Sequence, residues 1–150
     1  MDISQDDINR AVQQAISKGV RKIIATVDTQ AKSCAVRAAN QLRNAALNVL
    51  RGQRHGRRYK KPGTKTYYTA SVPGEPPAVR TGMLRMSWGM KAEGDGKGTY
   101  TAGIYSDVPY AELLDEGTPD GKTAPRPYKD KIIETAKPKV IEIFSEMETK

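Results

Sequence analysis

An apolar stripe at helical spacing runs through the first third of the chain, and no proline interrupts it. Its members stand three or four residues apart: Ile8, Val12, Ile16, Val20, Ile23, Val27, Ala31, Ala35, Ala38, Leu42, Ala46 and Val49. This spacing predicts a helix, with Ser4 and Asp7 approximating a capping box at its start and Gly52 as a stop signal. Unbroken, the helix would be about 70 Å long, which exceeds the diameter of a domain of this size.

We therefore expect part of the stripe to meet a partner or to fold back. Gly19 and the β-branched stretch 26–29 are two places where the helix could break, so residues 1–50 form either one long helix or two. The second half of the stripe is rich in alanine. Alanine lets another helix approach closely but buries little area per residue.

Residues 51–82 predict a basic and proline-rich loop region. Within it we expect a basic loop over 51–66, a strand over Thr66–Ala70, and a stiff extended loop over 71–78, where four of the eight residues are proline or glycine.

Residues 83–150 predict a β-hairpin flanked by helices. The expected elements are a short helix 82–87 capped by Thr81 and anchored by Met83, Leu84 and Met86, strands 88–93 and 99–106 around a five-residue glycine loop, a helix 109–116 ended by Gly117, a proline-rich loop 118–127, and a helix 127–147 kinked at Pro138. The last helix should turn inward Tyr128, Ile132, Ile133, Ala136, Val140, Ile143, Phe144 and Met147. We predict one domain over residues 1–150 with an α+β fold: a long N-terminal helix, a small antiparallel β-sheet with a hairpin, and a C-terminal helix packed on the sheet.

The positive charge of the chain is concentrated in one interval. The net charge is +8, yet residues 75–150 carry a net charge of −2, and no acidic residue occurs between Asp28 and Glu75. The candidate DNA-facing residues are Arg51, Arg54, Arg57, Arg58, Lys60, Lys61 and Lys65, with three tyrosines nearby. Such a run attracts phosphate without reading bases. A solvated or partner-binding loop is an equally good interpretation.

Catalytic chemistry has little support in the sequence. The single histidine, His55, lies among arginines, and the glycine loop 117–123 is one residue short of a phosphate-binding loop and is followed by prolines instead of a helix. The carboxylates Glu112, Asp115 and Glu116 share one short helix and are expected to be solvated or to form salt bridges. We predict no catalytic residue, no cofactor and no metal site, and a protein that is not an enzyme.

The single cysteine, Cys34, excludes an intrachain disulfide and is expected to be a small core residue. The acidic first residues do not resemble a secretory signal, and no segment approaches the 18 apolar residues of a membrane span. We therefore expect assembly in the cytoplasm of the cell that makes the protein, with no membrane partner.

Three segments, in this order, carry a family resemblance: 70–85, with Pro-Gly-Glu-Pro-Pro and Arg-Thr-Gly-Met-Leu-Arg; 108–118, with Tyr-Ala-Glu-Leu-Leu-Asp-Glu-Gly-Thr; and 124–128, Ala-Pro-Arg-Pro-Tyr. Together they resemble the tail-component, or neck, family of long-tailed bacteriophages and prophages. The likeness covers roughly residues 66–150. Departures are Asp115 where that family often has Glu, Tyr128 where Phe is usual, and a longer 118–124 loop.

The resemblance implies a non-enzymatic virion protein that forms a ring, commonly a hexamer, at the head–tail neck or tail completion interface. Its neighbours would be head-connector proteins and tail-tube or tail-terminator proteins. Separately, the basic charge of the chain suits a channel close to packaged DNA, which would be a further nonspecific contact. The candidate subunit interface comprises Pro73, Gly74, Glu75, Pro76, Pro77, Arg80, Thr81, Tyr110, Glu116, Gly117, Thr118, Pro125, Arg126 and Pro127. The alternative function is a nonspecific nucleic-acid-binding module that uses the basic loop 51–65.

Overall fold

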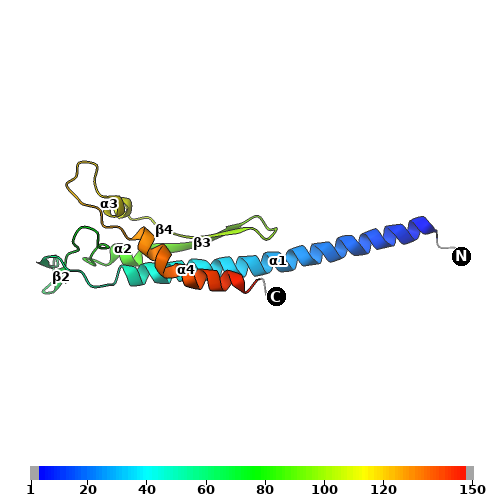
Figure 1. Cartoon of the computed structure of the whole chain (residues 1–150), viewed down its shortest axis with the longest axis horizontal. Coiled ribbons are helices and arrows are strands. Elements are labelled where there is room, and N and C mark those ends of the chain that lie inside the picture. Colours follow the sequence, from blue (N-terminus) through cyan, green and yellow to red (C-terminus); the bar gives the residue numbers. More distant parts are fainter. Residues whose placement is uncertain (1–3, 148–150) are drawn as a thin grey trace.

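The computed structural model describes residues 4–147, so the first three residues of the acidic N-terminal segment and residues 148–150 lie outside it. The elements in chain order are α1 (Gln5–Val49), β1 (Arg58–Lys60), β2 (Tyr67–Thr69), α2 (Met83–Met86), β3 (Trp88–Gly94), β4 (Tyr100–Ser106), α3 (Ala111–Glu116) and α4 (Lys129–Ser145). The predicted α+β class is confirmed, with two separate two-stranded antiparallel sheets, β1–β2 and β3–β4. Figure 1 shows an elongated molecule with α1 along its length.

The first half of the chain forms one helix, which decides between the two alternatives left open by the sequence. The Ser4 hydroxyl caps α1 by accepting the N–H of Asp7 (3.1 Å), as the capping-box pattern predicted. The β-branched stretch does not break the helix, and within it the Thr26 and Thr29 hydroxyls donate to the carbonyls four residues earlier. At 1.5 Å per residue, the 45 residues of α1 span roughly 67 Å.

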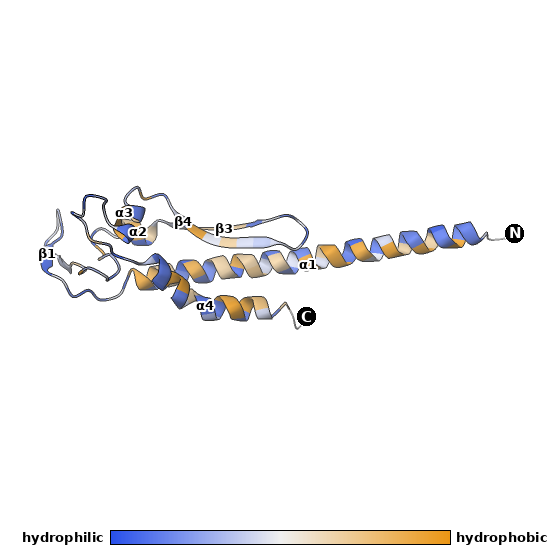
Figure 2. Ribbon diagram, turned by 45° about the horizontal axis from the view of Figure 1, so that its top comes forward, coloured by the Kyte–Doolittle hydropathy of each residue, from blue (hydrophilic) through white to orange (hydrophobic). Residues whose placement is uncertain are grey.

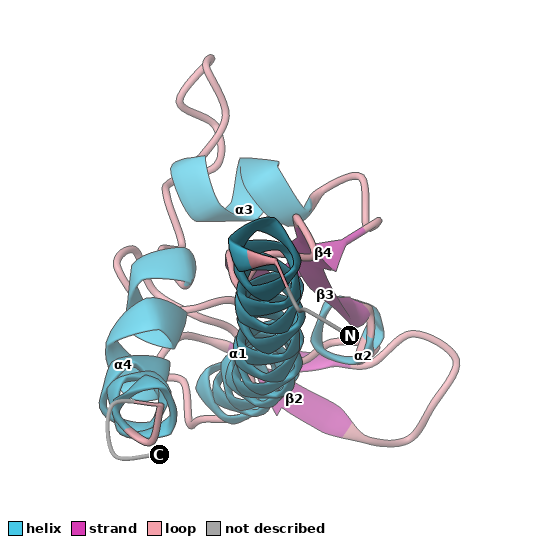
Figure 3. Ribbon diagram, turned by 90° about the vertical axis from the view of Figure 1, so that its right-hand side faces the viewer, coloured by secondary structure: helices cyan, strands magenta, loops and turns pink. Residues whose placement is uncertain are grey.

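Only the second half of α1 is covered by the rest of the chain. The buried residues of α1 are Ala31, Cys34, Ala35, Ala38, Ala39, Ala45 and Ala46. The helix α4 and the hairpin β3–β4 both pack on this half, and Figure 3, which looks along α1, shows them beside it. The small side chains allow this close approach. The burial of Cys34 confirms its expected place in the core.

The hairpin β3–β4 forms as predicted, from Trp88 paired with Ser106 to Gly94 paired with Tyr100. Its tip is fixed to α1 by Asp28, which accepts the Gly98 N–H and the Tyr100 hydroxyl, both at 3.1 Å. Asp28 therefore marks the point along α1 where the rest of the molecule begins.

The largest buried side chains gather where α1 ends. The buried residues of this core are Ala45, Ala46, Leu50, Leu84, Trp88, Val108, Tyr128, Ile132 and Ala136. The rings of Trp88 and Tyr128 meet edge to face at 6.0 Å. In the short helix α2 only Leu84 is buried, so the prediction that Met83 and Met86 are also anchors is wrong. The four residues of α2 make about one turn of helix, which places a single position on the core.

The C-terminal helix α4 packs on α1 and, through Ile132 and Ala136, joins the core that holds Trp88 of the hairpin. The inward direction predicted for Ile133 is wrong, because 56% of its surface is exposed, and Phe144 is also on the exposed side. One helix against one neighbour buries a narrower stripe than the sequence pattern shows. The helix continues through Pro138 and bends along its length, as Figure 1 shows.

Two other predicted boundaries change. Residues 51–66 are not entirely loop, because Arg58–Lys60 form β1 and pair with the expected strand β2. The helix predicted over 109–116 starts at Ala111 as α3. Within residues 4–147, no helix has both the length and the apolar character needed to cross a bilayer.

Candidate functional site

The N-terminal part of α1, residues 5–27, extends beyond the rest of the molecule and is here called the arm (Figure 1). Its exposed large apolar residues are Ile8, Val12, Ile16, Val20, Ile23, Ile24 and Val27, each between 41% and 64% exposed. Figure 2 shows these apolar positions recurring along the arm. Because isolated apolar residues are normal on a surface but a continuous stripe is not, the arm is a candidate contact surface.

The second and third resemblance segments are bound to each other. Asp115 at the end of α3 accepts the backbone N–H groups of Tyr128 (2.8 Å) and Lys129 (3.0 Å), and so caps the start of α4. The Tyr128 hydroxyl donates to the Ala111 carbonyl at 2.7 Å, and the Arg126 N–H donates to the Leu114 carbonyl at 2.7 Å. Burial is the main cause that raises the pKa of Tyr128 to about 12, so its hydroxyl stays protonated and remains a donor.

The first segment joins the same cluster through the proline-rich loop. The Gly74 N–H donates to the Pro125 carbonyl (3.3 Å), and the Arg126 Nε donates to the Ser71 hydroxyl (2.9 Å). Lys131 on α4 donates to the Gly74 carbonyl at 3.3 Å. The three segments, distant in sequence, therefore form one contiguous structure, here called the motif cluster.

Glu75 fixes the shape of that loop. Its carboxylate accepts the N–H of Val72 (3.0 Å) and of His55 (3.2 Å), and it also contacts the His55 Nδ1. The Val72 hydrogen bond and the His55 contact are the main causes that lower the Glu75 pKa to about 2. The His55 ring itself is 75% exposed, as expected for a solvated loop residue. This pairing could not be predicted from the sequence, because the two residues lie twenty positions apart.

The residues predicted for the subunit interface fall into three groups. Those exposed are Pro73, Gly74, Arg80, Thr81, Tyr110, Glu116 and Pro125. Those half-buried are Glu75, Gly117, Thr118, Arg126 and Pro127. Pro76 and Pro77 are buried by their own chain, so the prediction that they face a neighbour is corrected. They were selected as part of a stiff loop, and the sequence could not show that this loop packs inward.

A groove of about 580 Å³ borders the motif cluster. Its walls come from the end of α1, from residues 77–85 and from α3, with Leu50, Tyr68, Leu84, Tyr110 and Leu114 among the lining residues. Arg80, Arg85 and Arg126 also line it. The groove is therefore partly apolar and carries positive charge.

The sheet β1–β2 is a separate hairpin, here called the basic hairpin, at the end of the molecule opposite the arm (Figures 1 and 2). Every residue of β1 is exposed. The Arg58 guanidinium lies 4.7 Å from the centre of the Tyr67 ring, and that of Arg57 lies 5.8 Å from the centre of the Tyr59 ring. These stacks hold the guanidinium groups close to the strands while leaving their N–H edges free.

The seven candidate DNA-facing residues do not all lie on this surface. Arg51, Arg57, Arg58, Lys60 and Lys65 are exposed, and Lys61 is half-buried. Arg54 is different, because its guanidinium donates to the carbonyls of Val49 (2.8 Å) and Pro77 (3.1 and 3.2 Å). Its burial lowers the pKa of Arg54, and its role is to tie α1 to the proline-rich loop. The assignment of Arg54 to a DNA-facing surface is therefore corrected.

The glycine loop 117–123 is held by hydrogen bonds within itself. The loop 117–123 is closed by the Thr118 N–H donating to the Thr123 carbonyl (3.0 Å), and Asp120 accepts from the Thr118 hydroxyl (2.6 Å). No helix follows that loop directly, as a phosphate-binding loop requires. In the described part of the chain, no three His, Cys, Asp or Glu side chains are grouped to hold a metal ion.

No protein-family model, no curated protein and no solved structure matches this chain.

Proposed function

We propose that this protein is a structural subunit of a tailed-phage virion, which assembles with copies of itself into a ring at the head–tail neck or at the tail completion interface. The proposal assigns it no enzymatic activity. The observation that carries the self-assembly is the exposed apolar stripe of the arm. The virion location is supported by the three ordered resemblance segments, and head-connector and tail-tube or tail-terminator proteins are the proposed neighbours.

The energetics of the arm favour a contact with copies of the same chain in a closed assembly. Seven half-exposed aliphatic side chains would contribute about 1 kcal/mol each on burial, or roughly 5–10 kcal/mol in all. Association costs roughly 4–15 kcal/mol in lost freedom of motion and ordering. The net free energy of one arm contact alone is therefore close to zero. In a closed ring each subunit contacts two neighbours. The contact that closes the ring adds binding energy without immobilising a further subunit.

The motif cluster suits the second contact surface of such a ring. Its proline-rich loop is held by Glu75, Ser71 and Gly74, and α3 is locked to α4 through Asp115. Loops fixed before binding lose little conformational entropy when they dock. The arm and the motif cluster lie at different places along the long axis (Figure 1), which is the arrangement that a head-to-tail contact needs.

The test places charge on the apolar stripe. In the variant Ile16→Glu with Val20→Glu, two carboxylates would have to be buried in any arm contact. Light scattering coupled to size-exclusion chromatography should show an oligomer for the unmodified chain and a monomer for this variant, and negative-stain images should show rings for the unmodified chain alone.

The matched control is Gln14→Glu with Ser17→Glu, which adds the same charge off the stripe and should still assemble. Far-UV circular dichroism checks that α1 stays helical in both variants. A chain that remains monomeric at high concentration and is absent from purified particles would contradict the proposal. Equal assembly of both variants would show that the arm is not the contact.

A further inference from the structure

We propose that the basic hairpin is a binding element for duplex DNA, which enters the major groove as a two-stranded ribbon and contacts phosphates without reading bases. This is a function beyond ring assembly, and it rests on different residues. The hairpin lies at the end of the molecule away from its own arm, and its two strands are not part of the motif cluster (Figures 1 and 2).

The first support is the sign and density of charge. Residues 57–65 carry Arg57, Arg58, Lys60, Lys61 and Lys65, and the whole interval 29–74 contains no acidic residue. Unopposed cations are the footprint of phosphate binding. The nearby carboxylate Glu75 is occupied by two backbone N–H groups and by His55, at the base of the loop and not on the strands.

The second support is the shape of the hairpin. Side chains alternate along a strand, so Arg58 and Lys60 lie on one face and Tyr59 on the other, opposite Tyr68. Arg57 stacks toward Tyr59, which puts positive charge on both faces. Strands about 4.8 Å apart form a ribbon that fits the DNA major groove, which is about 12 Å wide. Each face of the ribbon can then contact the phosphates along one side of the groove.

The third support distinguishes duplex DNA from other nucleic acids. Single-strand binding requires tyrosine faces on which bases can stack. Here the Tyr67 ring carries Arg58 at 4.7 Å, and the Tyr59 and Tyr68 rings lie 6.0 Å apart, tilted toward each other. One face of each of these rings is therefore already packed against another side chain. A-form RNA has a major groove too narrow and deep for a ribbon.

The tip of the hairpin is ordered in a way that presents its lysines. The Lys61 N–H donates to the Thr66 carbonyl (2.9 Å), and the Thr64 hydroxyl donates to the Lys61 carbonyl (3.2 Å). Gly63 adopts a φ of 69°, which a tight turn needs and L residues rarely adopt. Lys61 and Lys65 therefore lie on either side of a closed turn.

The test measures binding of the full chain to a 30-base-pair duplex of mixed sequence by fluorescence anisotropy at several salt concentrations. Five phosphate contacts predict a slope of log affinity against log salt of about −4.5. The variant Lys60→Gln, Lys61→Gln, Lys65→Gln keeps both arginine stacks. It should flatten the slope by about 3 and weaken binding on the order of 10²-fold at 0.1 M salt.

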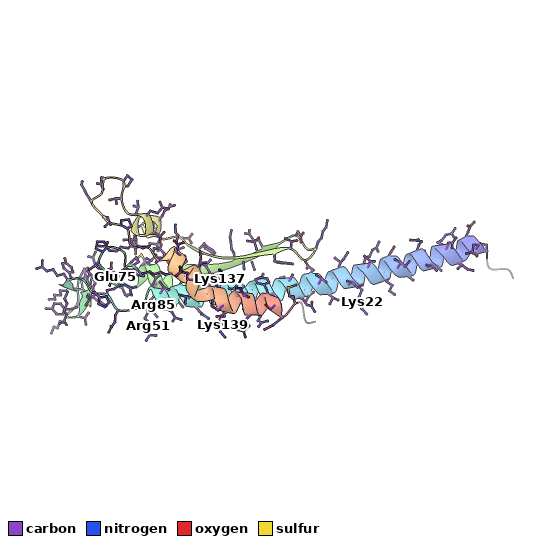
Figure 4. The ribbon with its side chains drawn as sticks, viewed as in Figure 1. Lys22, Arg51, Glu75, Arg85, Lys137 and Lys139 are labelled. Atoms are coloured by element: carbon purple, nitrogen blue, oxygen red, sulfur yellow. The ribbon has the colours of Figure 1, made fainter. Side chains whose placement is uncertain are left out.

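The matched control is Lys22→Gln, Lys137→Gln, Lys139→Gln, which removes the same charge from the arm and α4 (Figure 4). It should bind almost as the unmodified chain does. If the two variants lost the same affinity for the duplex, net charge alone would explain the binding, and the proposal would be overturned. Tighter binding of the single strand or of duplex RNA would overturn entry into the DNA major groove, and the absence of duplex binding at 50 mM salt would overturn the DNA-binding role.

Discussion

Replacing Asp115 tests the bond that joins the second and third resemblance segments. In Asp115→Ala, the N–H groups of Tyr128 and Lys129 lose the carboxylate that accepts both of them, and α4 loses its cap. Removing a cap costs up to about 2 kcal/mol, and a hydrogen bond to a charged group contributes about 1.5–3 kcal/mol. The Asp115 side chain is only 16% exposed, so water replaces it poorly.

We expect the free energy of unfolding to fall by about 2 kcal/mol, which lowers the midpoint temperature by roughly 4–8 °C for a chain of this length. Asp115→Asn keeps one oxygen acceptor and should lose about half as much. The measurement is urea unfolding followed by circular dichroism, at one protein concentration because assembly also stabilises the fold.

The matched control is Glu112→Ala, which removes an exposed carboxylate from the same helix. It should change the stability by no more than about 0.5 kcal/mol. If Asp115→Ala were as stable as this control, the cap would contribute nothing, and the account of how α3 holds α4 would be refuted.

Three further predictions concern single contacts. Because the folded-state pKa of Glu75 is about 2, below its ordinary 4.5, its contribution to the free energy of unfolding is present above about pH 4.5 and is lost as the pH falls toward 2. The difference in urea midpoint between the unmodified chain and Glu75→Gln should shrink over that range, and a constant difference would contradict the assignment. Tyr128→Phe removes the hydroxyl bound to the Ala111 carbonyl and should cost about 1 kcal/mol in urea unfolding, whereas no loss would mean that the bond adds nothing. Gly117→Ala should cost roughly 2–4 kcal/mol by calorimetry, because φ is 81° and a Cβ would meet the neighbouring backbone oxygen at 2.8 Å; Gly121→Ala, with φ of 72° and open space, should cost only about 1, and equal losses would refute the steric part.

Periodicity carried most of the fold prediction. The stripe of α1, the alternation in β3–β4 and the Pro and Gly signals around α3 are local patterns, and each produced the expected element. The same periodicity could not say which half of α1 is covered. That depends on where α4 and the hairpin return to it, and Asp28, which anchors the hairpin tip, looks in sequence like any other surface acid.

The candidate site was less predictable, because its key contacts are long-range. Arg54 looks like its basic neighbours in the sequence, and only the fold brings the Pro77 carbonyl within 3.2 Å of its guanidinium. The strand β1 was missed because arginine and lysine flank its single tyrosine, and the pairing with Tyr68 cannot be read from either strand alone. The capping role of Asp115 is equally hidden, since its two partners lie 13 and 14 positions further along the chain.

The position of Trp88 gives the molecule a built-in optical reporter. It is the chain's single tryptophan, and it is buried against Tyr128, where α4 meets the hairpin β3–β4. Neither the arm nor the basic hairpin contributes to that environment. Its emission should therefore shift when the core opens and stay constant when a polyanion binds the basic hairpin, so fluorescence separates loss of the native state from binding at that end of the molecule.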